Sequence, residues 1–374
     1  MTRLSHLRAL YDERGPLATV YLDSTRTTET GDHEVELRWA AQRAALEEAG
    51  APRDVIEALE PSALRPTGVP GGTTTVLVGG ADGLLFESVL PLRMPERASW
   101  ALLPDLAPLV VALGRTAPYV LVHLDRTGAD IDVVGPLGET QAHETVQGGT
   151  HHGRKVNAGG WSQKRYQQRA ENLWEENADQ VAAELDRILA ETGIEILAVT
   201  GDTQVREKLA DALGQRGRAA YVPLESGGRG AGSSEEAVRE ELGRVLAAHV
   251  TRQSEDPVSR FREQTGAGHG AALSGRAAVV EALQKGQVDA LLVTPDLDDD
   301  STLYVGASPE QLATSEADLA AMGVEGGQAV RADAALVAAA VATDAGVVVV
   351  PKGRIDLTDG VGALLRYADA TSSS

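Results

Sequence analysis

One stretch of the sequence decides how the chain is interpreted: Gly159-Gly160-Trp161-Ser162-Gln163-Lys164-Arg165-Tyr166-Gln167-Gln168-Arg169. A pair of glycines lets the backbone approach a partner closely, because no Cβ stands in the way. The helical pattern that follows opens with Lys164 and Arg165, yet the start of a helix favours acids, so each misplaced cation costs about 0.3–1 kcal/mol. A local stability rule is thus broken where a functional loop is expected. RNA phosphate is the natural compensating anion.

The charge of the whole chain makes this stretch unusual. The sequence has 34 basic and 55 acidic residues, a net charge of −21, which argues against a general nucleic-acid-binding surface. No acid occurs between Glu144 and Glu171, however. The window holds these basic and imidazole side chains: His151, His152, Arg154, Lys155, Lys164, Arg165 and Arg169. The alternative is a basic hairpin without a partner, in which Trp161 is a core aromatic and not a platform for a stacked base.

The composition excludes several classes of protein. The chain has no cysteine, so it has neither disulfides nor thiolate metal sites. Its first residues lack the apolar core of a signal peptide, and no apolar run reaches the ~18–20 residues of a membrane helix. We therefore expect a cytoplasmic protein without membrane contact, and we expect no cofactor and no metal.

The hydrophobic pattern predicts an α/β fold of three domains, with boundaries at 1–116, 117–260 and 261–374. In the first domain, Thr74–Val78 and Leu84–Val89 predict a hairpin around Asp82-Gly83. The proline-rich stretch 91–118 is interpreted as a connection to the next domain.

The second domain is expected to contain three strands in hairpin order, followed by alternating helices and strands. The strands are predicted at 119–124, 129–134, 140–146, 194–200 and 219–222, and a long amphipathic helix at 163–190. This order is typical of an RNase H-like sheet, with the glycine-rich loop 148–160 protruding from it.

The third domain is predicted to be an α/β/α sandwich. Its helices are expected at 275–285, 308–322 and 333–343, and its strands at 288–293 and 347–350.

Other polar motifs have ordinary explanations beside functional ones. Asp125, Asp130 and Asp132 have the chemistry of a two-metal nuclease, but Asp125 also begins an ordinary turn. Residues 227–232 are glycine-rich but lack the Gly-Lys-Ser/Thr ending of a phosphate loop, which favours a flexible linker. The segment Asp23–Arg26 follows a strand, where polar residues bind ligands or cap the next helix.

The glycine-rich stretch resembles a known family. Class-one archaeal and eukaryotic release factors carry a Gly-Gly-Gln-Ser loop and then a basic helix start that bears an aromatic residue. This chain has Gly159-Gly160-Trp161-Ser162 with Arg165, Tyr166 and Arg169. The segment 281–293 resembles the helix–strand opening of the family's C-terminal domain, and 359–367 is similar to the ending of its bacterial branch. The resemblance is to bacterial archaeo-eukaryotic release factor family 2, which includes Pelota-like ribosome hibernation factors of the Balon type.

The resemblance implies a ribosome-associated translation factor for hibernation or rescue, which binds the A site with its loop directed toward the peptidyl transferase centre. It implies contacts with rRNA or tRNA by these residues: His151, His152, Arg154, Lys155, Gly159, Gly160, Trp161, Ser162, Gln163, Lys164, Arg165 and Arg169. A translational GTPase such as elongation factor Tu is the implied partner of the acidic third domain. The segment Asp23–Arg26 is an implied contact to ribosomal RNA at the decoding centre.

One departure from the family concerns catalysis. Trp161 occupies the position of the glutamine that places the attacking water in release factors, and an indole has one donor and no acceptor. We therefore predict no catalytic residue, and Gln163 is the weak candidate if the loop is threaded differently. Two alternatives stay open at this stage: a peptidyl-tRNA hydrolase that acts through the same loop, and an α/β adaptor protein without a ribosome contact.

Overall fold

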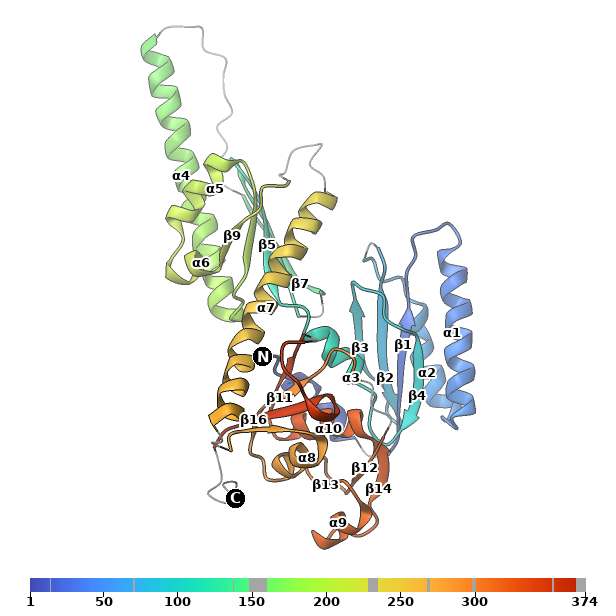
Figure 1. Ribbon diagram of the computed structural model, residues 1–374. Helices are drawn as coiled ribbons and strands as arrows, with labels where there is room; N and C mark the ends of the chain where they lie inside the picture. Colours follow the sequence, from blue (N-terminus) through green and yellow to red (C-terminus); the bar gives the residue numbers. More distant parts are fainter. Residues whose placement is uncertain are drawn as a thin grey trace. The chain divides into compact units, whose positions relative to one another are not determined.

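The structure is a computed structural model. It describes residues 1–13, 15–69, 71–136, 138–147, 160–227, 235–267, 270–297, 301–351 and 353–367, without the side chains of 160–174. The chain forms two compact units (Figure 1). One is Thr116–His249, and the other combines Met1–Arg115 with Val250–Ser374.

The unit Thr116–His249 is built on a five-stranded sheet in the order β7-β6-β5-β8-β9. The strands are β5 (Tyr119–Asp125), β6 (Gly128–Val134), β7 (Thr140–Gln147), β8 (Leu197–Gly201) and β9 (Tyr221–Pro223). The first three are antiparallel neighbours, whereas β8 and β9 run parallel to β5. The α/β class and the three hairpin strands of the predicted RNase H-like sheet are therefore confirmed.

Helices cover both faces of this sheet. The helices α4 (Gly160–Thr192), α5 (Thr203–Ala212) and α6 (Gln215–Ala220) lie on one face, and the first part of α7 (Glu235–Ala267) lies on the other (Figure 1). The strands alternate accordingly, so that Val120, Val122 and Leu124 of β5 are buried in the core beneath α4.

Residues 1–115 contain a separate antiparallel sheet in the order β3-β2-β1-β4. Its strands are β1 (Leu17–Asp23), β2 (Thr74–Gly80), β3 (Gly83–Leu90) and β4 (Arg97–Ala101), and its helices are α1 (Gly31–Glu48), α2 (Arg53–Leu64) and α3 (Ala107–Leu113). The predicted hairpin is confirmed as β2 and β3. The prediction of a connection at 91–118 is wrong, because β4 pairs with β1 and every residue of α3 except Pro108 is buried.

Residues 250–374 contain two small sheets, in the orders β10-β16-β11-β15 and β13-β12-β14. The strands are β10 (Ala272–Ser274), β11 (Val288–Val293), β12 (Thr302–Val305), β13 (Leu312–Ala313), β14 (Gln328–Arg331), β15 (Gly346–Val349) and β16 (Val361–Leu365). The helices are α8 (Arg276–Gln284), α9 (Glu316–Ala321), α10 (Ala332–Ala342) and the short η2 (Thr358–Gly360).

One helix predicted for this region is wrong. The range 308–322 begins with a loop and the strand β13, and only Glu316–Ala321 is α-helical. The cause is local: the Ser315 hydroxyl accepts a hydrogen bond from the Asp318 N–H at 3.1 Å, which starts α9 at that point.

The first residues of the chain pack against this C-terminal region. Thr2 and Val347 exchange two backbone hydrogen bonds of 2.8 Å, so the N-terminal segment pairs with the outer side of β15. The short helix η1 (Ser5–Tyr11) packs on α10, with Leu7 fully buried, and Arg8 donates to the Ala342 carbonyl at 2.7 Å. This contact joins segments more than 330 residues apart, and it protects a strand edge that is otherwise open to pairing.

We predict that Leu7→Ala destabilises the unit that contains β15 by about 2–5 kcal/mol, because the substitution removes a fully buried side chain. The matched control is Leu37→Ala on α1, where the leucine is 60% exposed and the expected change is within about 0.5 kcal/mol. Denaturant unfolding, together with hydrogen exchange at the α10 amides, measures both. Equal effects of the two substitutions would contradict the packing of η1 on α10.

Candidate nucleic-acid interface

The predicted RNA-contacting loop connects the edge strand β7 to the long helix α4. The strand ends at Gln147 and the helix begins at Gly160. His151, His152, Arg154, Lys155 and Gly159 lie outside the described residues.

The remaining predicted contacts lie in the first turns of α4, and only their backbone is described. They are Gly160, Trp161, Ser162, Gln163, Lys164, Arg165 and Arg169. The helix starts three residues before the predicted Gln163, so Trp161 and Gln163 have helical backbone and are not part of an extended loop.

The C-terminal part of α4 anchors the helix to the sheet. Among the α4 residues whose side chains are described, Asn177 and Ala178 are the first buried ones, after the exposed Glu175 and Glu176. Apolar positions then recur at helical spacing and pack on β5 and β6: Val181, Ala182, Leu185, Ile188 and Leu189. At about 1.5 Å per residue, the segment 160–176 forms roughly 25 Å of helix before Asn177.

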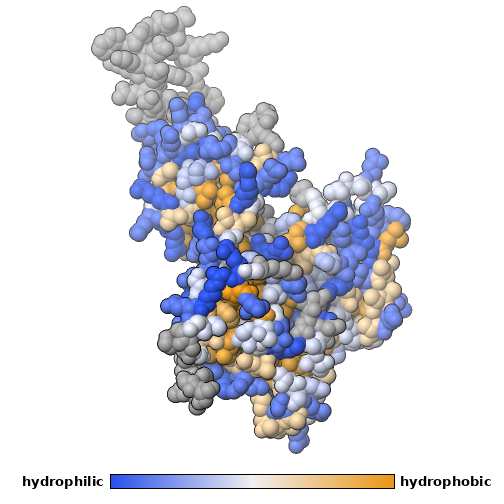
Figure 2. Space-filling view, viewed as in Figure 1, coloured by the Kyte–Doolittle hydropathy of each residue, from blue (hydrophilic) through white to orange (hydrophobic). Residues whose placement is uncertain are grey.

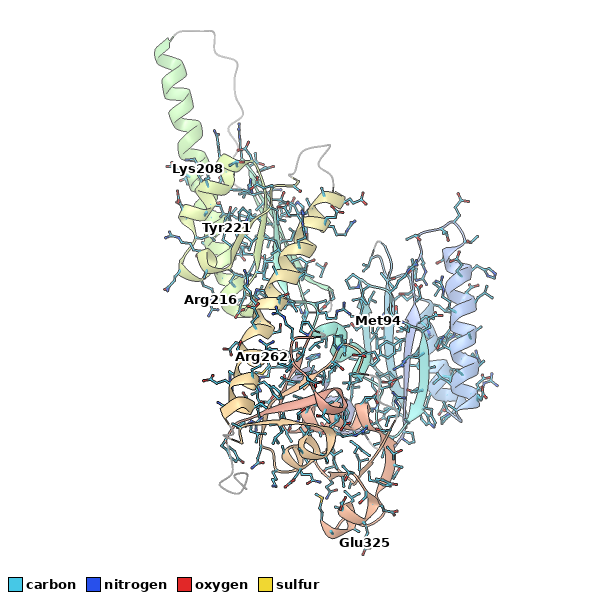
Figure 3. The ribbon with its side chains drawn as sticks, in the orientation of Figure 1. Met94, Lys208, Arg216, Tyr221, Arg262 and Glu325 are labelled. Carbon is cyan, nitrogen blue, oxygen red and sulfur yellow. The ribbon has the colours of Figure 1, made fainter. Side chains whose placement is uncertain are left out.

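Polar contacts fix α4 to its neighbours as well. The Asn177 amide donates to the carbonyl oxygen of Arg126 at 3.1 Å, which ties the helix to the turn between β5 and β6. Lys208 of α5 and Arg216 of α6 are labelled in Figure 3. Lys208 donates to Glu175 at 2.9 Å, and Arg216 donates to the carbonyl of Leu189 at 2.8 Å. The direction in which α4 leaves the sheet is therefore fixed by packing and by hydrogen bonds.

A charge network joins α4 to β7. Arg187 of α4 donates to Glu191 at 2.6 Å, to Glu144 of β7 at 3.2 Å, and to Glu184. A hydrogen bond with Glu184 raises the pKa of Glu144, whereas the hydrogen bond from Arg187 lowers the pKa of Glu184. The cation of Arg187 is thus used within the unit to hold the strand that leads into the predicted loop.

The opposite face of β6 and β7 carries a polar group that the sequence did not indicate. The registers align Asp132 with His143, and His143 Nδ1 lies 2.7 Å from Asp132 Oδ1. Thr145 donates to Asp130 at 3.1 Å on the same face. The hydrogen bond to Asp132 raises the pKa of His143, which is exposed. The hairpin pattern alone could have suggested this pair, because opposed residues share a face.

The three aspartates considered for a two-metal nuclease each bind a different partner of the same unit. Asp125 accepts from the N–H and the hydroxyl of Thr127 in the turn, while Asp130 and Asp132 contact β7. Among the described residues, there is no group of three or more His, Asp or Glu side chains placed to hold a metal ion.

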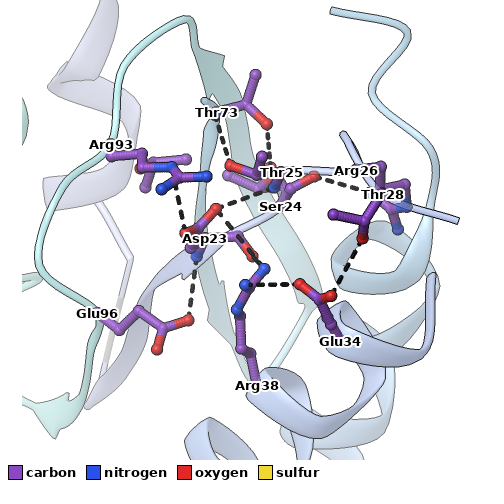
Figure 4. Close-up of polar contacts among 12 residues, drawn as sticks. Asp23, Ser24, Thr25, Arg26, Thr28, Glu34, Arg38, Thr73, Arg93 and Glu96 are labelled. Carbon is purple, nitrogen blue, oxygen red and sulfur yellow. Dashed lines mark hydrogen bonds and ion pairs between the residues drawn. The ribbon is translucent and has the colours of Figure 1, made fainter. Parts of the chain in front are cut away.

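The segment Asp23–Arg26, at the end of β1, is held by its own domain (Figure 4). Ser24 and Thr25 are buried and bond to the hydroxyl and the backbone of Thr73. The Arg26 guanidinium donates to the carbonyl of Leu64 and to Asp32, both at 2.7 Å.

Two more arginines belong to the same cluster. Burial favours the neutral form of Asp23, but hydrogen bonds from the hydroxyl and the N–H of Thr25 hold the pKa of that carboxyl below its usual range. Arg38 at 3.8 Å and Arg93 at 3.7 Å lower this pKa further by their charge. The cations of this cluster are thus paired with carboxylates of the same domain, which is the arrangement of a structural cluster.

The glycine-rich stretch after β9 joins this strand to α7, but residues 228–234 lie outside the described residues. Before it, Thr200 donates to the carbonyl of Ser226 at 2.5 Å, and Glu241 accepts from the N–H of Glu225 and of Ser226. The buried Arg206 donates to the carbonyl of Leu224 at 2.8 Å. Sequence reasoning did not identify Arg206, because a helical arginine carries no signal of its burial.

Comparison with known proteins assigns the chain to a family. The model for bacterial archaeo-eukaryotic release factor family 2 matches residues 118–267. The Mycobacterium tuberculosis protein Rv2629 (strain H37Rv) is 30% identical over 375 residues, which covers 98% of this chain and 97% of the relative. This chain belongs to bacterial archaeo-eukaryotic release factor family 2. The match contains the whole five-stranded sheet, and it ends at the last residue of α7.

Solved structures of more distant proteins were also found. The archaeal translation termination factor aRF1 is 16% identical, over 97% of this chain and 96% of its own, with a TM-score of 0.26. Pelota of Archaeoglobus fulgidus is 13% identical, over 97% and 91%, with a TM-score of 0.34. The assignment to family 2 therefore rests on sequence.

On the face seen in Figure 2, hydrophilic residues prevail, and hydrophobic residues show in patches between them. Among the described residues, no helix is both long enough and apolar enough to cross a bilayer.

We predict that the His143 pKa lies above its ordinary value of 6.5 and falls when Asp132→Asn removes the carboxylate. A raised pKa means that the pair stabilises the fold below pH 6.5, and that this contribution is lost as the pH rises through the raised pKa. An NMR titration of the imidazole measures the shift, and Thr145→Val serves as a control that leaves the pair intact. A wild-type pKa at or below 6.5 would show that the contact is absent in solution.

Proposed function

We propose that this protein is a ribosome-associated translation factor of the hibernation or rescue type. It binds in the A site, and the segment 148–169 reaches toward the peptidyl transferase centre. The observation that carries the proposal is the window between Glu144 and Glu171, which holds five Lys or Arg residues and no acid in a chain of net charge −21. Membership of the release factor family supports it, because the family model matches the part of the chain that contains this window.

The chemistry of the window fits a dense RNA environment. Lysine and arginine side chains that bind phosphate release the counterions condensed on RNA, which favours binding. Arg154, Lys155, Lys164, Arg165 and Arg169 are assigned to phosphate contacts. His151 and His152 are assigned to the same RNA surface.

The residues around the glycine pair are assigned by their size and chemistry. Gly159 and Gly160 permit close approach of the backbone. Trp161 stacks on a base or wedges between groups, with Ser162 and Gln163 beside it. Since an indole cannot accept a hydrogen bond from water, the role assigned to the loop is occupation of the site and not hydrolysis.

The packing of the C-terminal part of α4 also supports the proposal. Because Val181, Leu185 and Leu189 are buried against the sheet, a contact made at the start of α4 holds the whole unit in place on its partner. A folded helix also loses less conformational entropy on binding than a disordered segment does. The acidic residues 261–374 are assigned to a protein partner, a translational GTPase such as elongation factor Tu.

We predict that Arg165→Glu weakens binding to ribosomes and lowers the slope of log K against log salt by about 1, since one phosphate contact is lost. The matched control is Arg53→Glu, which makes the same change of charge on α2, where the arginine side chain is 81% exposed. Co-sedimentation with purified ribosomes over a series of salt concentrations measures both variants.

Two results would contradict the proposal. If the wild-type protein stays in the supernatant at low salt, the chain is an adaptor without a ribosome contact. If ribosomes that carry peptidyl-tRNA release their peptide with the wild type but not with Gln163→Ala, the chain is a hydrolase that acts through the same loop.

A further inference from the structure

The strand β7 is the outermost strand of its sheet and pairs with β6 on one side only. No other strand of the described residues pairs with its outer side. The outward N–H and C=O groups of such an edge are a template for another strand. β7 spans Thr140–Gln147, and this length is enough to pair with an extended peptide.

Apart from a β-bulge at Gln141, which leaves residues 142–147 in a regular ladder with β6, β7 lacks the residues that usually prevent pairing at an edge. Between Thr140 and Gln147 there is no proline, lysine or glycine. The one acid is Glu144, which is directed to the α4 side and held there by Arg187. The outer side of the strand therefore keeps its capacity to accept a further strand.

The face of the sheet beside this edge is polar. On that face, Val238 and Leu242 of α7 cover the part of the sheet near β8 and β9. The part formed by β6 and β7 carries Asp130, Asp132 and His143 instead, and the His143 side chain is 59% exposed. On a strand added to β7, alternate side chains would lie on this face beside His143 and Thr145. Asp130 and Asp132 would lie one strand further in, about 10 Å from the added backbone, within reach of the long side chains of lysine and arginine.

The charge of this region selects the kind of partner. The strands β5 to β7, from Tyr119 to Gln147, carry five carboxylates against one arginine: Asp125, Asp130, Asp132, Glu139 and Glu144 against Arg126. Arg126 lies 3.8 Å from Asp202, and Arg239 of α7 acts electrostatically on Tyr119 at the far side of the same face. This excess of acid repels RNA phosphate, and it also repels a second copy of a chain with net charge −21.

We propose that the outer edge of β7 binds a basic, extended polypeptide segment by strand addition. Backbone hydrogen bonds to β7 supply affinity, and Asp130 and Asp132 select lysine or arginine on the added strand. This inference rests on the proposed function in one respect: the basic segment is expected to come from a protein bound beside the same RNA. Since β7 leads directly into residue 148, a basic protein segment at its edge would lie next to the RNA that the loop contacts.

The test uses the full-length protein and a capped peptide of alternating lysine and threonine, about ten residues long. Calorimetry measures affinity, and NMR hydrogen exchange locates the protected amides. We expect binding, with new protection confined to β7 among the strands. A peptide of the same charge with prolines at alternate positions should not bind, because it cannot form the ladder.

Two charge variants complete the test. The double variant Asp130→Asn with Asp132→Asn should weaken binding of the peptide by about two- to fivefold for each carboxylate. Its control, Asp82→Asn with Asp256→Asn, changes two aspartates of the other unit, both exposed, and should bind like the wild type. If the Asp130/Asp132 variant does not fold, the comparison of the two peptides on the wild type decides alone.

Several results would overturn the proposal. They are absence of binding, equal binding of the proline peptide, protection at amides outside β7, protection of β7 by a single-stranded RNA oligonucleotide in place of the peptide, or a dimer that buries β7. Co-sedimentation with ribosomes reports on the proposed function independently, so a failure of the edge to bind peptide does not alter that result.

Discussion

The packing of the C-terminal part of α4 on the five-stranded sheet is the interaction on which the remaining structure of this unit depends. Val181, Leu185, Ile188 and Leu189 fill the face formed by β5 and β6, and they are buried almost completely. The burial of four such side chains stabilises the unit by roughly 6–12 kcal/mol before entropy costs. The same packing fixes the direction in which the first half of α4, with its cations, leaves the sheet.

Basic and acidic side chains are concentrated in different parts of this unit. Arg187, Lys208 and Arg216 are engaged by carboxylates and carbonyls of the unit itself, which stabilises its fold. No acid stands among the cations between Glu144 and Glu171, and the strands β5 to β7 carry an excess of acid. Such a separation suits binding to RNA and to a basic protein at the same time, because phosphate is attracted to a basic surface and lysine or arginine to an acidic one.

The sequence predicted the parts of the fold that depend on local pattern. Alternating residues in 119–134 and the helical period of 178–189 reflect side chains that face one core, so both elements could be located. Residues 91–118 could not be assigned, because β4 and α3 form only when β1 supplies a partner distant in sequence. The pairing of Thr2 with Val347 has the same cause, since no local pattern encodes a contact between the two ends of a chain.

Only part of the candidate site could be predicted from the sequence. The run of cations at 154–169 is visible in the sequence because it interrupts an acidic chain, and its last three members lie on α4, whose C-terminal part is anchored to the sheet. The contact of His143 with Asp132 and the pairing of Arg26 with Asp32 depend on register and on tertiary packing. For this reason the segment Asp23–Arg26, considered for an RNA contact, proved to be engaged by its own domain.

The central claim is that α4 carries the segment around Trp161 into contact with ribosomal RNA. A photo-crosslinking amino acid at position 161, irradiated in the presence of ribosomes, tests this contact at the residue concerned. The account predicts crosslinks from position 161 to rRNA or tRNA, and none from the same probe at the exposed position 37 of α1. Crosslinks from position 161 that reach only this protein, with no RNA attached, would contradict it.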